Sequence, residues 1–266
     1  MKNIYILISF LIVLTGCRVV EFDPELDNLN ENILVVEALI TDVSEMQYVK
    51  LHRTTAYMSE EEPESVNNAV VDVSDGNQVY PFMNSGNGIY NAPTGFNGEI
   101  GKTYRLKISL EGEVYEAESK MLPAFAFDSL EILKDDLFGS EQYVINCVIT
   151  ENLSNPDYVL SIYAQNGVLN DSLANRTLFT VENLNGQTIE GYLFMGIEGN
   201  TGDKITVYTY SVDEEYLQFY NAAAASLMPP NPFMPPPGAS VKGNISNGAL
   251  GFFQISAVWE EDLFIP

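Results

Sequence analysis

The sequence has 266 residues and carries 37 acidic against 12 basic side chains, which gives a formal net charge of −25 at pH 7. A negative field of this size repels nucleic-acid phosphates and anionic lipid headgroups, so nucleic-acid binding is the first function class that we exclude. Because the acidic side chains are scattered along the chain, we interpret the charge as a source of solubility and not as a cation site.

The first 16 residues predict an export signal. Lys2 precedes an apolar run at residues 4–14, about half the length of a membrane-spanning helix. The four residues at 14–17, Leu-Thr-Gly-Cys, resemble the lipobox of bacterial lipoproteins, in which the cysteine thiol takes a diacylglyceryl group. We therefore expect residues 1–16 to be removed and Cys17 to carry acyl chains that hold the protein at a membrane. The alternative is an ordinary secretory signal with a coincidental cysteine.

Residues 17–32 are acidic and without periodicity, and we interpret them as a lipidated tether. Removing 16 of 266 residues leaves 250, enough for two domains with a core each. With Cys17 acylated, Cys147 is the remaining thiol, so we expect no intrachain disulfide. Cys147 shares a predicted strand face with Ile145 and Ile149, which indicates a small core residue and not a nucleophile.

Residues 33–120 predict a β-sandwich domain, because short β-rich runs alternate with turn signals. Asp75-Gly76 and Glu111-Gly112 separate consecutive runs and favour tight hairpins. Between residues 104 and 110, apolar side chains alternate with basic and polar ones, so one face of that strand should be buried and the other solvated. We expect strands at residues 33–40, 47–53, 69–74, 78–82, 88–91, 103–110 and 113–119.

Residues 121–127 predict a crossover into a second β-rich domain, which we place at 121–266. Its expected strands are 130–134, 142–151, 158–164, 177–182, 188–197 and 203–212. Residues 213–226 predict one helix, because Asp213 can cap it, acidic residues follow, and four alanines favour helix. An apolar stripe at helical spacing should pack against the sheet; its members are Tyr216, Phe219, Tyr220 and Ala223.

A proline-rich stretch follows the helix at residues 229–238 and cannot continue it. One interpretation is a stiff connection over the surface. The other is an exposed apolar prong, Phe233 and Met234, that contacts a partner with little entropy to lose on ordering. Residues 241–256 predict a glycine-rich turn that leads into an aromatic strand, and the glycines are too irregular to cradle a phosphate.

The chain lacks the G-x-S-x-G, P-loop and H-E-x-x-H motifs, and His52 is its one histidine. In the strand predicted at 47–53, His52 falls on the more polar face, which favours a solvent-facing or edge position over a catalytic one. We therefore predict no catalytic residues, no metal site and no cofactor. The run at 72–77 could offer oxygen ligands to calcium but is more simply a hairpin, and two carboxylates suited to hydrolysis remain possible.

Two short segments, Asp128-Ser129-Leu130 and Asp171-Ser172-Leu173, resemble the O-glycosylation sequon of Bacteroidota. The resemblance implies that Ser129 or Ser172 carries a glycan.

Several segments together resemble a Bacteroidota outer-membrane lipoprotein family of unknown function. They are residues 35–42, 68–73, 88–90, 101–104, 115–117, 243–248 and 251–253. Members of that family are commonly encoded beside TonB-dependent receptors. The first part also resembles Ig-like, transthyretin-like or carboxypeptidase-regulatory-like sandwiches, which are interaction modules.

The resemblance implies a noncatalytic outer-membrane lipoprotein, surface-exposed in preference to periplasmic. Its expected role is accessory or ligand-capture partner of a TonB-dependent receptor. The alternative is a stand-alone adhesin or carbohydrate-binding sandwich, and a third hypothesis is an unrecognised hydrolase with two carboxylates of opposed pKa.

Overall fold

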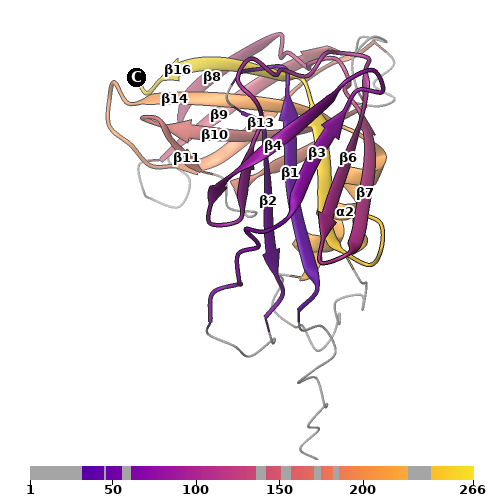
Figure 1. Ribbon diagram of the computed structural model, residues 1–266. Coiled ribbons are helices and arrows are strands. Elements are labelled where there is room, and N and C mark those ends of the chain that lie inside the picture. The colour runs from indigo at the N-terminus through magenta and orange to yellow at the C-terminus, as the bar shows by residue number, and fades with distance from the viewer. Residues whose placement is uncertain are drawn as a thin grey trace, which may run out of the picture.

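The computed structural model describes residues 32–44, 46–55, 61–135, 142–150, 157–170, 175–181, 186–226 and 241–266. They form two β-sandwiches with one helix beside the junction (Figure 1). The predicted mainly β fold with a single helix is confirmed for this part of the chain. Within it, no helix is long and apolar enough to cross a membrane. The predicted signal and four predicted site residues lie outside the described ranges: residues 1–16, Cys17, Ser172, Phe233 and Met234.

The first sandwich is an eight-stranded sheet in the order β15-β1-β2-β5-β4-β3-β6-β7. The early part of β4 pairs with β3 and its later part pairs with β5, so β4 belongs to both layers. All neighbours are antiparallel except β1 and β15, which run parallel. The strands are β1 (Leu34–Thr41), β2 (Tyr48–Arg53), β3 (Val70–Ser74), β4 (Val79–Gly86), β5 (Ile89–Asn91), β6 (Thr103–Leu110), β7 (Glu113–Lys120) and β15 (Leu250–Ser256).

Alternating side chains build the core of this sandwich. In β6 every second residue, beginning with Tyr104, is buried and the residues between them are mostly exposed, as the sequence pattern predicted. In β1 the buried set begins with Leu34, while Glu37 and Leu39 lie on the opposite face. The two buried sets meet in one hydrophobic cluster, so the outward face of β1 remains available to another part of the molecule.

Residues 241–257 complete the first sandwich, although the predicted domain boundary after residue 120 assigns them to the second domain. Gly251 has a φ of +97°, and a Cβ there would lie 2.0 Å from the Val36 carbonyl oxygen, so only glycine allows β15 to approach β1 this closely. The Asn244 amide hydrogen-bonds both backbone groups of Phe253, at 2.8 and 3.0 Å. Strand β15 lies at the edge of the sheet, where its outer backbone N–H and C=O groups would otherwise be unpaired. The segment around Asn244 supplies hydrogen-bond partners for two of these groups.

The second sandwich consists of two facing sheets. One has the order β13-β9-β8, and in the other β10 pairs with β14 on one side and with β11 and β12 on the other, while β16 follows β14. A hydrophobic cluster fills the space between the sheets. The strands are β8 (Ser129–Asp135), β9 (Gln142–Thr150), β10 (Tyr158–Gln165), β11 (Val168–Asn170), β12 (Thr177–Thr180), β13 (Thr188–Ile197), β14 (Lys204–Val212) and β16 (Val258–Phe264).

The thirteen strands predicted with definite bounds are all found, with ends displaced by at most four residues, and the aromatic strand predicted within residues 241–256 is β15. Two further strands, β11 and β16, were not predicted. Strand β11 follows a turn at Asn166-Gly167, in which both residues have positive φ; this asparagine-glycine pair is a strong hairpin signal. Strand β16 carries three consecutive acidic residues at 260–262, so its sequence lacks the alternation of apolar and polar residues that predicts a strand. Its Trp259 and Leu263 nevertheless pack on the core.

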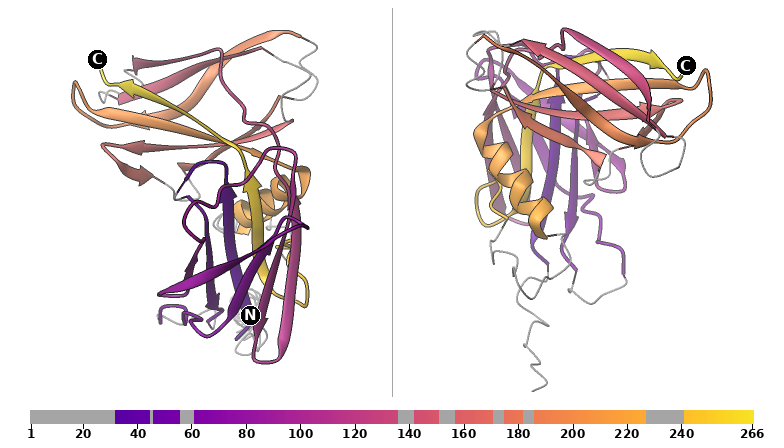
Figure 2. Two further views of the ribbon diagram at one scale, coloured as in Figure 1. Left: turned by 45° about the horizontal axis from the view of Figure 1, so that its top comes forward. Right: turned by 180° about the vertical axis from the view of Figure 1, so that it is seen from behind.

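One extended segment joins the two sandwiches. Strand β15 in the first sheet and β16 in the second are separated by Ala257 alone, which is buried. The left view of Figure 2 shows this segment in yellow, running from one sandwich into the other. The Ser256 hydroxyl donates to the Ser211 carbonyl at 2.8 Å, and the Val258 N–H donates to the Asp42 carboxylate at 2.8 Å. Covalent continuity and hydrogen bonds therefore hold the junction together.

Candidate functional site

The helix α2 (Glu214–Ser226) begins where the sequence predicts. The Asp213 carboxylate accepts the Tyr216 N–H at 2.8 Å, which satisfies one free donor of the first turn. Glu214 and Glu215 then place negative charge at the positive end of the helix. The predicted apolar stripe is confirmed, because Tyr216 and Tyr220 are buried and Phe219 is half-buried.

The helix packs against both sandwiches. The ring centroids of Tyr216 and Phe219 lie 5.1 and 5.2 Å from that of Phe252 on the outer face of β15. The same cluster takes Leu160 from β10 and Tyr210 from β14. The right view of Figure 2 shows α2 beside the first sandwich. Four elements, α2, β10, β14 and β15, therefore enclose one apolar region.

A groove of about 760 Å³ opens in this region, within the size range of small-molecule sites, which form preferentially between domains. Its walls come from the outer face of the first sandwich, from β10 and β14, and from α2. The residues that define it are Leu39, Tyr48, Tyr210, Tyr216, Phe219 and Phe252. We call this site the junction groove.

A few polar groups interrupt the apolar lining. The Arg176 guanidinium lies near enough to the Tyr216 hydroxyl to influence its pKa. Burial raises the pKa of Tyr216 to about 12, and the positive charge of Arg176 opposes that rise. Burial also raises the pKa of Tyr210, so both phenols are neutral at physiological pH. On another wall, Glu37 forms an ion pair with Lys50 at 3.4 Å.

Tyr210 is 4% exposed and lines the junction groove from β14. Among the residues that the structure describes, the buried side-chain atoms without a hydrogen-bond partner are His52 Nδ1 and Ser161 Oγ, and the Tyr210 hydroxyl is not one of them.

His52 lies on the outward face of β2 with Tyr48 and Lys50, as predicted, but it is neither at a sheet edge nor solvent-facing. Strand β2 lies between β1 and β5, and the His52 side chain is 18% exposed. Burial lowers its pKa below 6.5, while the charge of Glu37, whose carboxylate lies 3.6 Å from Nδ1, acts in the opposite direction. The imidazole is therefore mainly neutral at pH 7.

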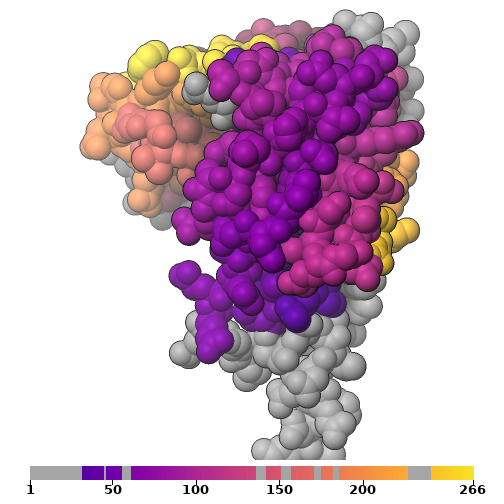
Figure 3. Space-filling model, in the orientation of Figure 1, coloured from indigo at the N-terminus to yellow at the C-terminus, as the bar shows by residue number. Residues whose placement is uncertain are grey.

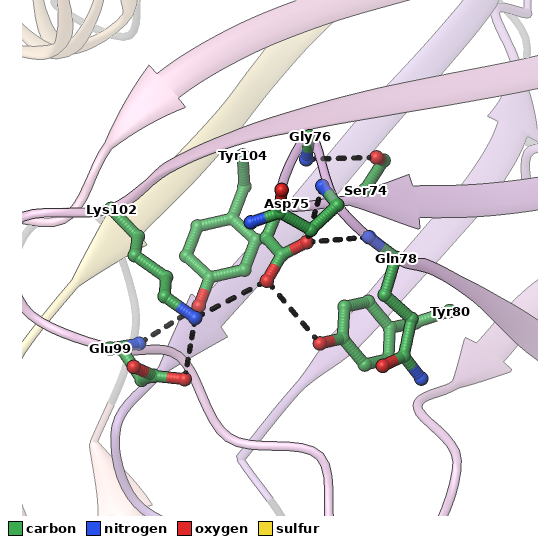
Figure 4. Close-up of polar contacts among 9 residues, drawn as sticks. Ser74, Asp75, Gly76, Gln78, Tyr80, Glu99, Lys102 and Tyr104 are labelled. Carbon is green, nitrogen blue, oxygen red and sulfur yellow. Dashed lines mark hydrogen bonds and ion pairs between the residues drawn. The ribbon is translucent and has the colours of Figure 1, made fainter.

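The possible oxygen cluster at residues 72–77 is a hairpin (Figure 4). One carboxylate oxygen of Asp75 accepts the N–H groups of Asn77 and Gln78, at 3.0 and 2.8 Å. The other accepts from the Lys102 ammonium at 3.2 Å. These backbone hydrogen bonds are the main cause of the lowered pKa of Asp75. The lysine occupies the place where a cation would bind, and the described residues contain no group of three potential metal ligands.

A second hollow, of about 610 Å³, lies over β3, β6 and β7, the strands on the face shown in Figure 3. Its side chains carry both signs of charge. Arg105 forms an ion pair with Glu118, and Lys107 lies opposite Glu116 in the strand register. Because these charges compensate one another on an exposed surface, we interpret the hollow as a solvated face of the sandwich.

Two other predicted residues are placed by the structure. Cys147 is buried in the core of the second sandwich with Ile145 and Ile149, which confirms its interpretation as a core residue; burial raises the pKa of its thiol. Ser129 is exposed at the start of β8, so its hydroxyl is accessible, and its glycosylation stays a prediction.

Sequence reasoning missed Arg176, Tyr210 and Tyr48 as groove residues. Tyr48 and Tyr210 lie in predicted strands and Arg176 directly precedes one, and the strand pattern does not identify which surfaces meet. A usable signal was the presence of five tyrosine and phenylalanine residues between residues 208 and 220, because large aromatic side chains are frequent in ligand-site linings.

No curated protein matches the sequence. A family model described as "Domain of unknown function (DUF4249)" matches residues 19–262, a range that spans both sandwiches, α2 and the junction groove. The chain therefore belongs to the DUF4249 family.

Proposed function

We propose that this protein is a noncatalytic outer-membrane lipoprotein that captures a small ligand in the junction groove as the partner of a TonB-dependent receptor. The observation that carries the proposal is the groove itself, a site of about 760 Å³ with aromatic walls between two interlocked sandwiches. Its dimensions and lining suit binding, since such sites hold ligands by apolar contact and orient them with a few polar groups.

The positions of the reactive side chains support a noncatalytic role. His52 lies on the first sandwich, with Lys50 and Glu37 as its charged neighbours, whereas Cys147 is buried inside the second sandwich. Nucleophilic catalysis needs a nucleophile and a base within hydrogen-bond reach, and these two residues belong to different cores.

The start of β1 supports an anchored arrangement. Strand β1 begins at the end of the first sandwich that lies away from the second (Figure 1). A lipid on Cys17 would hold that end near the membrane and present the second sandwich outward. On the cell surface, this arrangement would place the junction groove between the bilayer and the outermost strands, beside a receptor in the same membrane.

The test is affinity purification of the full tagged protein from solubilised outer membranes. We expect mass spectrometry to recover a TonB-dependent receptor with it, and the N-terminal peptide to carry acyl chains on Cys17. The control is the Cys17→Ser variant, which should lose the lipid and most of the receptor. Recovery of no receptor, or an unmodified Cys17 in the native protein, would contradict the proposal.

The alternative is a stand-alone adhesin or carbohydrate-binding protein. The observation that favours it is a pair of exposed aromatic side chains on the second sandwich, Tyr192 at 58% and Phe264 at 62% exposure, because carbohydrate-binding surfaces use such rings. Glycan-array binding by the purified protein that is lost in Tyr192→Ala or Phe264→Ala would support this role.

A further inference from the structure

We infer that the junction groove takes an uncharged, apolar small molecule. The inference rests on the ligand capture proposed above and specifies the chemical class of the ligand. Three observations carry it: the polar side chains of the lining have partners within the protein, the rest of the lining is apolar and rich in aromatic rings, and the charge of the molecule disfavours ions in the groove.

Two polar side chains of the lining have partners at defined distances. Glu37 forms an ion pair with Lys50 at 3.4 Å. The Gln254 side-chain amide donates a hydrogen bond to the Ser256 hydroxyl at 2.9 Å. A ligand group that bound to Glu37 or Gln254 would have to replace an interaction that already exists. Neither residue therefore favours a charged or strongly polar ligand.

The other polar side chains of the lining are also satisfied. Tyr48 and Arg176 each interact with another group of the chain. Among the residues that the structure describes, the buried side-chain atoms without a hydrogen-bond partner belong to His52 and Ser161, and neither residue lines the groove. Within this part of the chain, the lining thus contains no buried side-chain donor or acceptor that a ligand must satisfy.

The remaining lining residues are apolar and come from separate elements. Leu39 lies on β1, Leu160 on β10, Phe219 on α2 and Phe252 on β15. Contact with an apolar ligand removes these surfaces from water, which is the dominant favourable contribution to binding at an apolar site. The aromatic rings also favour a ligand with flat rings, because such rings pack against one another edge-to-face or offset.

The charge of the molecule disfavours an ionised ligand of either sign. The formal net charge of −25 repels anions. A cation is attracted by this field but meets the positive charge of Arg176 in the lining. Transfer of an ion from water into an apolar site costs free energy, which an opposite charge already held by another partner offsets poorly. An uncharged molecule avoids this cost.

The experiment compares two fluorescent probes, N-phenyl-1-naphthylamine, which is uncharged, and 8-anilino-1-naphthalenesulfonate, which adds one sulfonate to the same rings. Titrations use the chain from residue 17 onward with Cys17→Ser and contain no detergent, so that neither acyl chains nor detergent compete for the groove. We expect the uncharged probe to bind at least about tenfold more tightly, because the sulfonate loses hydration without gaining a partner.

A second pair of compounds tests the opposite charge. We compare 1-naphthalenemethanol with 1-naphthylmethylamine, which is a cation at neutral pH, as competitors that displace N-phenyl-1-naphthylamine. The two share one ring system and differ in the end group. We expect the alcohol to displace the probe at a concentration at least about tenfold lower than the amine. Equal displacement would overturn the inference.

Three variants locate the probe. Ala223→Trp adds an indole on the groove side of α2 and should weaken binding of N-phenyl-1-naphthylamine by at least about tenfold. Phe219→Ala removes one aromatic wall and should weaken it by about three- to tenfold. The matched control is Asn221→Trp, an exposed position of the same helix outside the lining, which should leave the affinity unchanged. Urea unfolding verifies that each variant is folded.

Absence of N-phenyl-1-naphthylamine binding would overturn the inference, and it is the result expected if a second copy of the chain fills the groove. Equal or tighter binding of the sulfonate would also overturn it, as would wild-type affinity in folded Ala223→Trp and Phe219→Ala variants. Recovery of a receptor from membranes together with absent probe binding would reject the ligand class and leave the receptor partnership intact. Probe binding without a recovered receptor would support the ligand class and contradict the partnership.

Discussion

Strands β6 and β14 differ in what they face, and the difference explains where the groove lies. In β6 buried and exposed residues alternate almost perfectly, because one face meets the core of the first sandwich and the other meets water. In β14 seven of nine residues are buried, because one face meets the second core and the other meets α2 and β15. A sheet covered on both faces needs a third layer. In this protein α2 and β15 form that layer, and the space left between them and β14 is the groove.

The same contrast occurs within two consecutive residues. Phe253 is 0% exposed and points into the first core, while Phe252 is 6% exposed and points toward α2 and the groove. Successive side chains of a strand face opposite sides. Substitutions of these two neighbours therefore test the closed core, through Phe253, and the open junction, through Phe252, at one place in the chain.

The largest expected effect is that of Phe253→Ala. Its ring is surrounded by the first core, and truncation should reduce the free energy of unfolding by about 3–5 kcal/mol, measured by urea denaturation. Phe264→Ala is the matched control, since that ring is 62% exposed and its loss should change the free energy by less than about 0.5 kcal/mol. A small effect of Phe253→Ala would mean that the first core is not closed.

The second effect is that of Phe252→Ala, which should cost about 1.5–3 kcal/mol. The cost is lower because the ring borders the groove, where neighbouring side chains and water can take its place. The same urea experiment checks it. A cost equal to that of Phe253→Ala would show that the junction is packed as densely as a core and would remove the distinction between the two regions.

The third effect comes from the start of the helix that covers β14. Asp213→Ala removes the acceptor of the Tyr216 N–H and should reduce the free energy of unfolding by about 1 kcal/mol. Asp213→Asn keeps a capping oxygen and should recover most of it. Equal losses in both variants would indicate that the charge of Asp213, and not its hydrogen bond, stabilises the helix.

The smallest effect concerns the partly covered outer face of β2. Burial lowers the pKa of His52, so the unfolded chain takes up a proton first as the pH falls. His52 therefore contributes stability that is present above pH 6.5 and is lost as the pH falls from 6.5 toward the lower folded pKa. Urea unfolding at about pH 7.5 and about pH 5.5 should show less pH dependence in His52→Gln than in the native protein. An unchanged dependence would mean that His52 is solvated.

The elements that the sequence predicted well are those whose pattern is local. The alternation around Leu106 and the capped helix after Asp213 depend on neighbours within a few residues, and the structure has both. Strand β16 was missed because Glu260, Glu261 and Asp262 obscure its apolar positions. The acids are tolerated at a sheet edge, where Asp262 forms an ion pair with Lys204 at 2.8 Å.

Long-range pairing could not be predicted from these patterns. Strand β15 was expected as an aromatic strand, but periodicity carries no information on its partner, and that partner is β1, more than 200 residues earlier in the chain. The groove follows from this pairing, because β15 brings Phe252 to the face of α2. Tyr210 and Arg176 line one groove only because these surfaces meet.

The segment at residues 250–264 supplies a strand to each sandwich in succession, which imposes an order on assembly. During synthesis, β1 and β14 each lack one neighbouring strand until residues 250–264 have been made, so neither sandwich can be completed before then. A protease cut just before Leu250 would accordingly damage both halves in one event. A chain that lacks residues 250–264 therefore has neither sandwich complete, and both sandwiches should expose unpaired strand edges together.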